Sequence, residues 1–193
     1  MGVFDAEDAE PFDLDDDVDL DEDDDDFDDD DLEDASEDDV DLVVAAYRED
    51  GEPIAVPLDY DLANDLDELI RQLTRLPGDS GADGFVSVGG DFFVIVRARG
   101  RMVEVLLSDA TAANEWPLAR DVLDYLGEDI PDEDDDSYPV GDLGMFAASG
   151  LRSFELEALA TDYDADSYEC LERIAEKLKI ADEFHAAAAE FDD

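Results

Sequence analysis

The hydrophobic positions first form two short runs separated by a polar turn. The runs are LVVAAY at residues 42–47 and PIAVPL at 53–58, and Gly51 stands in the segment between them. Runs of this length, bounded by turn residues, are typical of β-strands. Pro53 and Pro57 cannot donate hydrogen bonds to a neighbouring strand, so the second run is predicted to be an edge strand. Together the two runs predict a hairpin.

Three further apolar runs follow one another at intervals too short for parallel crossovers. They lie at residues 85–88, 92–98 and 102–108. Gly89-Gly90 and Gly100 stand in the two connections, and glycine accepts the positive φ that tight hairpin turns require. These runs predict a three-stranded antiparallel meander.

Between and beyond the strands, apolar residues recur at helical spacing. A helix is predicted over 62–76, with Asp59 or Asp61 as its N-cap and Pro77-Gly78 as its stop. A second helix is predicted from Pro117 to Gly127. Three more are predicted in the last third of the chain, at 142–149, 154–161 and 167–188.

The pattern as a whole predicts an α+β fold: an antiparallel β-sheet, made of the hairpin and the meander, backed by helices, with a helical C-terminal third. We expect one domain over residues 42–189. It divides into a strand and helix part at 42–127, an acidic loop at 128–140 and a helical part at 141–189.

Charge changes this picture at the N-terminus. The 193 residues carry a net charge of -51, and 25 of the 62 acids, but no Lys or Arg, lie in residues 1–41. Such a segment cannot bury enough apolar surface to offset the entropy of ordering, so it is predicted to be a disordered acidic tail. Phenylalanine and leucine residues scattered among the acids suit docking onto a basic surface, while a purely solubilising tail fits the composition equally well.

The remaining 37 acids face 11 bases, so the domain is acidic too. A negative field repels phosphate backbones and anionic lipids, which argues against direct nucleic-acid or membrane binding and favours a basic protein partner. With Cys170 as the only cysteine, no intrachain disulfide can form. The chain shows no signal peptide and no run of about 20 apolar residues, so we expect a cytoplasmic protein.

The inventory of reactive side chains is small. His185 is the only histidine, and Cys170 lies fifteen residues before it on one predicted helix, which separates the two by about 22 Å. A zinc site needs several such ligands close together. The abundant carboxylates match no calcium-loop spacing. We therefore predict no catalytic residue, metal site, cofactor or small-molecule substrate.

One basic cluster stands out against the acidic background. Arg97 and Arg99 alternate along a predicted strand, so they project from the same face, and Arg101 follows across the turn. The three guanidinium groups could form an anion or partner contact. Alternatively, they neutralise nearby carboxylates of the same domain.

Three segments together resemble the actinobacterial tRNA adenosine deaminase-associated proteins. They are VEVLLSDATAANEW, PVGDLGMFAASGLRSFELEAL and YECLERIAEKLKIADEFHAA, and the similarity spans residues 41–187. The resemblance implies an association with a tRNA adenosine deaminase and transfers no catalytic or binding residue. A zinc deaminase needs H-x-E and P-C-x-x-C motifs. His185 is followed by two alanines, so this chain is not the deaminase itself.

These observations favour a non-catalytic accessory protein that engages a basic partner through its acidic surface and tail, and we expect this partner to be a tRNA adenosine deaminase. An alternative is an acidic nucleic-acid mimic that inhibits the partner, and a further one is a metal-assisted hydrolase. The charge could also reflect a general compositional bias, since Asp greatly outnumbers Glu and only two lysines occur.

Overall fold

A computed structural model describes residues 32–78 and 80–191. Residues 1–31, most of the predicted acidic tail, lie outside the described residues. Ala35, which precedes the expected domain start at residue 42, is buried in the core. The amide side chain of Asn64 holds it in place, accepting from the Ala35 N–H at 2.7 Å and donating to its carbonyl oxygen at 3.0 Å.

The described strands form a single six-stranded antiparallel sheet with the order β2-β1-β3-β4-β5-β6. Strand β1 pairs with β2 on one side and with β3 on the other, so the predicted hairpin and meander join into one sheet. The predicted fold class is confirmed. The strands are β1 (Val40–Glu49), β2 (Glu52–Pro57), β3 (Ala82–Val88), β4 (Phe92–Arg99), β5 (Met102–Leu107) and β6 (Val140–Gly141).

Strand β2 is an edge strand, as its prolines predicted. The N–H of Leu58 donates to the carbonyl oxygen of Val43 at 2.8 Å, and Pro57 is paired with Val44 in the ladder. Because inward and outward N–H groups alternate along a strand, the nitrogens of Pro53 and Pro57 both point away from β1, toward the free edge.

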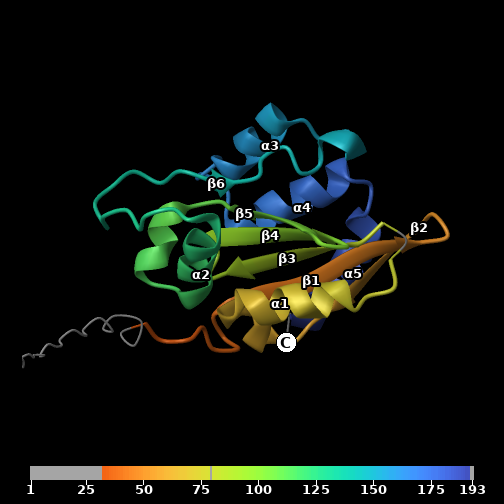
Figure 1. Cartoon of the computed structure of the whole chain (residues 1–193), viewed down its shortest axis with the longest axis horizontal. Coiled ribbons are helices and arrows are strands. Elements are labelled where there is room, and N and C mark those ends of the chain that lie inside the picture. Colours follow the sequence, from red (N-terminus) through yellow and green to blue (C-terminus); the bar gives the residue numbers. More distant parts are fainter. Residues whose placement is uncertain (1–31, 79, 192–193) are drawn as a thin grey trace, which may run out of the picture. The chain divides into compact units, whose positions relative to one another are not determined.

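Helices cover both faces of the sheet (Figure 1). On one face, α1 (Leu66–Thr74) and α2 (Pro117–Leu126) pack on alternate strand residues such as Val43, Val86 and Val94. On the other, α4 (Ser167–Lys177) and α5 (Ala181–Ala188) pack on the intervening residues, and α3 (Ser153–Ala160) contributes to the same core. Burial on both faces explains why the strands are continuously apolar rather than alternating.

The first predicted helix begins later than expected. Residues Tyr60–Asn64 form a 3₁₀ helix, and α1 starts only at Leu66. Its N-cap is Asp65, whose carboxylate accepts from the N–H of Glu68 at 3.1 Å, so the assignment to Asp59 or Asp61 was wrong. Leu62 is apolar at helical spacing because the 3₁₀ turn is buried against the same core.

The last predicted helix, 167–188, is two helices. Lys179 has φ 66°, in the left-handed region, and the N–H of Ile180 donates back to the carbonyl oxygen of Ala175 at 2.9 Å. This hydrogen bond closes a Schellman-type end to α4 before α5 begins. The helix expected at 142–149 is also absent as such: the segment holds a single 3₁₀ turn, Ala147–Ser149, after the unpredicted strand β6.

Candidate functional site

A groove of about 1040 Å³ opens where the start of β1, the end of β2, the first residues of α4 and the C-terminal end of the described chain meet. We call it the acidic groove. Carboxylates and aromatic residues make up most of its lining. The lining carboxylates are Glu37, Asp38, Asp41, Asp59 and Glu190, and the lining aromatic residues are Tyr60, Tyr168 and Phe191.

A buried polar network fixes one wall of the acidic groove. The carboxylate of Asp41 accepts from the Ser87 hydroxyl at 2.7 Å and from the N–H of Gly90 at 2.8 Å. The hydroxyls of Ser87 and Ser167 lie 2.6 Å apart. Since Ser87 gives its single proton to Asp41, Ser167 is the donor of that bond. The network therefore ties β1, the β3–β4 turn and the first residue of α4 together beneath the groove.

The chemistry of this groove suits a cation. Neither Lys nor Arg is among the described residues that line it, so its carboxylates are not neutralised there. Just outside the lining, the pKa of Asp91 is raised, first by burial and then by the charges of Asp41 and Asp109. A basic side chain could meet carboxylate oxygens and the face of a tyrosine ring at once.

The structure places the three predicted arginines differently from one another. Arg97 and Arg99 share one face of β4, and each has a carboxylate beside it: Asp83 lies 3.4 Å from Arg97 and Glu104 lies 3.4 Å from Arg99. Arg101 lies exposed in the β4–β5 turn. The three side chains therefore do not share one pocket.

Arg97 lines a second hollow, of about 290 Å³, which we call the basic pocket. Its charged lining residues are Arg48, Asp83, Arg97 and Lys179, and its other lining includes Ser80, Ser149 and Phe146. The Arg48 side chain could have been placed on this face from its alternation with the buried Val44 and Ala46. Lys179 could not, because the helix break that brings it here has no glycine to mark it.

Within the basic pocket, burial and charge act on Asp83 in opposite directions. Burial raises the pKa of Asp83 to about 6, although Arg97 and Arg99 pull it down, and Glu104 adds a smaller upward effect. The carboxylate therefore changes charge around pH 6.

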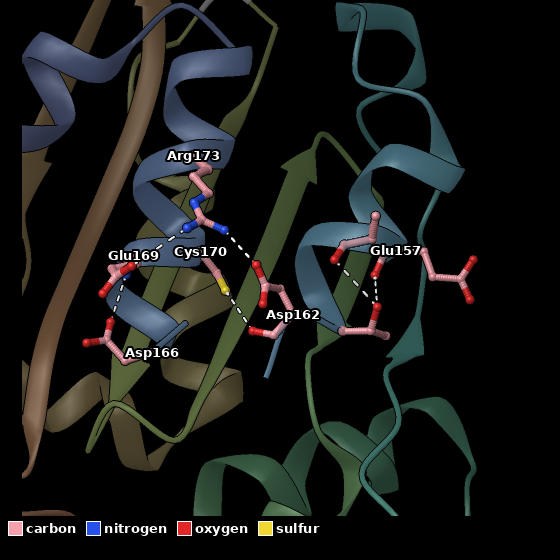
Figure 2. A network of polar contacts seen from close by, with 8 residues as sticks. Glu157, Asp162, Asp166, Glu169, Cys170 and Arg173 are labelled. Carbon is pink, nitrogen blue, oxygen red and sulfur yellow. Dashed lines mark hydrogen bonds and ion pairs between the residues drawn. The ribbon is translucent and has the colours of Figure 1, made fainter. Parts of the chain in front are cut away.

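Cys170 has none of the features of an activated nucleophile. Its Sγ lies 3.9 Å from the backbone oxygen of Asp162, and burial, followed by the charge of Asp162, raises the pKa of the thiol. Figure 2 shows the guanidinium of Arg173 between Asp162 and Glu169, at 2.7 and 3.8 Å, respectively. The nearest cation is thus occupied by carboxylates, and the network links α4 to the segment that precedes it.

His185 lies on the surface between the two last helices. Its Nε2 atom is 3.0 Å from a carboxylate oxygen of Glu172, so it joins α5 to α4. Over residues 32–78 and 80–191, no three His, Cys, Asp or Glu side chains are grouped so that they could hold a metal ion. In the same part of the chain, no helix has the length and apolar character needed to cross a membrane.

Comparison with known proteins gives one family. The model of the Rv3753c-like tRNA adenosine deaminase-associated proteins matches residues 41–181. The protein Rv3753c of Mycobacterium tuberculosis is 34% identical over 146 residues, which cover 74% of this chain and 84% of the relative. No solved structure gives a significant match.

Proposed function

Because the chain belongs to the Rv3753c-like tRNA adenosine deaminase-associated protein family, we propose that it is a non-catalytic accessory protein that binds a tRNA adenosine deaminase in the cytoplasm. The acidic groove is the proposed contact surface, and the partner contributes a basic segment. The family description supplies the partner, and the groove supplies the chemistry of recognition.

The observation that carries this proposal is the lining of the acidic groove. Five carboxylates and three aromatic side chains surround a hollow of about 1040 Å³. An arginine or lysine inserted there would form charge-assisted hydrogen bonds and stack on an aromatic face, both of which strengthen as water leaves. The net charge of -51 adds long-range attraction, which raises the rate of encounter with a basic surface.

A matched pair of variants tests the proposal. The groove variant carries Glu37→Gln, Asp38→Asn, Asp59→Asn and Glu190→Gln, all at exposed positions in the groove. The control variant carries Asp132→Asn, Glu133→Gln, Asp134→Asn and Asp136→Asn, in the exposed loop between α2 and β6. Each variant removes the same number of charges, so any difference between them reports position rather than net charge.

The measurement is the dissociation constant for the organism's own tRNA adenosine deaminase, by calorimetry at 0.15 M salt. We expect the groove variant to bind about tenfold more weakly and the control to stay within about twofold of the parent chain. Equal losses of affinity in both variants would show that the deaminase responds to net charge and not to the groove. No binding by the parent chain would contradict the proposal as a whole. Adding tRNA as a competitor tests the alternative of a nucleic-acid mimic. If the chain occupies the tRNA-binding surface of the deaminase, tRNA should displace it from the complex.

A further inference from the structure

The basic pocket concentrates positive charge on an otherwise acidic molecule. Three of the chain's 11 basic residues, Arg48, Arg97 and Lys179, line its 290 Å³, together with the one carboxylate of Asp83. The described lining therefore carries an excess of two positive charges. Acids outnumber bases by more than five to one in the sequence. If these basic residues served only to neutralise carboxylates of the same domain, the lining of the pocket would be expected to hold more acidic than basic residues.

Arg97 is held in one orientation before any ligand arrives. Its Nη1 donates to the carbonyl oxygen of Met145 at 2.8 Å, its Nε lies 3.4 Å from Asp83, and its guanidinium carbon lies 5.2 Å from the centroid of the Phe146 ring. The Nη2 group makes no hydrogen bond to the described part of the chain. A guanidinium fixed in this way loses little side-chain freedom when it binds an anion.

Lys179 reaches the pocket through a backbone conformation that lysine rarely adopts. Its φ of 66° places it at the break between α4 and α5, where glycine is the usual residue. A cation is favoured at the end of α4, but Lys177 already provides one there. Strained backbone at a non-glycine residue points to a requirement for the side chain itself. The Lys179 ammonium forms no ion pair with any residue that the structure describes.

Arg48 closes the third side. Its guanidinium donates to the carbonyl oxygens of Leu178 at 3.3 Å and Gly51 at 3.4 Å, so it bridges the β1–β2 turn and the α4–α5 break. These contacts hold the three cations around one hollow even though they lie far apart in sequence. The hydroxyls of Ser80 and Ser149 add neutral donors to the lining.

We propose that the basic pocket is a binding site for a small phosphate monoester. The excess of two positive charges matches the dianion, the fixed guanidinium of Arg97 matches phosphate oxygens, and the half-buried Tyr47 adds an aromatic residue to the lining for contact with the organic group of the ester. Free inorganic phosphate shares the anionic chemistry but not the apolar contact. The site is separate from the acidic groove and does not depend on the proposed partner.

The probes are phenyl phosphate and inorganic phosphate, titrated into the full chain at pH 7.5 and constant ionic strength, with binding followed by calorimetry. We expect saturable binding of phenyl phosphate with a dissociation constant below about 1 mM, and weaker binding of inorganic phosphate. An equal affinity for both would assign the site to the phosphate group alone and overturn the monoester claim. No saturation up to about 10 mM would overturn the site altogether.

Lys179→Gly separates binding from folding. Glycine suits φ 66°, so this variant should unfold at a higher temperature than the parent chain and still bind phenyl phosphate at least fivefold more weakly. Lys177→Gln, which removes the same charge two residues away and does not line the pocket, should bind within twofold of the parent. Unchanged affinity in Lys179→Gly, or equal losses in both variants, would contradict the proposal.

Discussion

The Nε atom of Arg97 lies 3.4 Å from the Oδ1 atom of Asp83, and only 13% of the arginine side chain and 21% of the aspartate side chain are exposed. Despite this contact, the pKa of Asp83 is raised to about 6. The free-energy penalty of removing the carboxylate from water is therefore larger than the stabilisation by the nearby guanidinium, as is common for ion pairs shielded from water. The pair orients Arg97 at a cost in stability.

The raised pKa predicts a pH-dependent stability that can be isolated with Asp83→Asn. The folded protein holds the Asp83 proton more tightly than the unfolded chain does, so this contribution is complete below pH 3.8 and is lost as pH rises through 6. Between pH 5 and 7 the parent chain should lose about 1 kcal/mol of unfolding free energy relative to the variant.

Urea denaturation of both proteins at pH 5, 6 and 7 measures this difference. The other carboxylates are common to the two proteins, so their titration cancels in the comparison. Parallel pH profiles for parent and variant would show that Asp83 titrates at its ordinary pKa in the folded state.

Salt dependence is the second prediction, and it concerns the proposed complex with the deaminase. Screening shortens the reach of charges from about 10 Å at 0.1 M salt to about 3 Å at 1 M. The association rate should therefore fall by about tenfold or more over this range, while the dissociation rate changes less. Surface plasmon resonance resolves the two rates, and an association rate insensitive to salt would count against electrostatic attraction.

Gly81 and Gly100 form a matched pair for the third prediction, because both have positive φ, 95° and 60°. A Cβ on Gly81 would lie 2.2 Å from the carbonyl oxygen of Ala98 and 2.9 Å from the Cα of Arg99, whereas a Cβ on Gly100 meets nothing within 4 Å. Gly81→Ala should cost more than about 3 kcal/mol or prevent folding, and Gly100→Ala about 1 to 2 kcal/mol.

Thermal and urea denaturation compare the two glycine variants with the parent chain. The steric argument requires a clear difference between them. Similar losses in Gly81→Ala and Gly100→Ala would mean that the backbone around Ala98 and Arg99 relaxes, and that only the positive φ matters.

The fourth prediction concerns the thiol of Cys170, which is 4% exposed and whose pKa is raised. Because the thiolate is the reactive form, a thiol reagent at pH 8 should label the folded protein far more slowly than a free cysteine. In 6 M guanidinium chloride the same thiol should react at the ordinary rate, which serves as the control. Fast labelling of the folded protein would show that this part of α4 opens readily.

The sheet could be predicted because its signals are local. Short apolar runs separated by Gly51, Gly89 and Gly100 identified five strands, and Pro53 with Pro57 identified an edge. Strand β6 was missed because two residues carry no detectable period. The break at Lys179 was missed because the apolar spacing of α4 continues across it into α5, with Leu178 and Phe184 in the same core.

The two hollows could be predicted only in part. Alternation placed Arg97 and Arg99 on one face, but it gave no sign that Asp83, from another strand, would lie half-buried beside Arg97. The basic pocket also depends on Arg48 and Lys179, which are 131 positions apart in sequence and meet only through the packing of α5. The acidic groove could not be predicted for another reason. The chain has 62 acidic residues, and nothing in the sequence distinguishes the five that line the groove from the others.

The prolines of β2 have a consequence for how this molecule can associate. Three backbone nitrogens of β2 point toward the free edge, at positions 53, 55 and 57, and two of them belong to proline. Only Ala55 therefore has an N–H group that could donate to an incoming strand. Another chain cannot continue the sheet on this side by lending a strand, the route by which many β-proteins swap segments or polymerise. A partner that binds at this edge must instead be recognised through side chains.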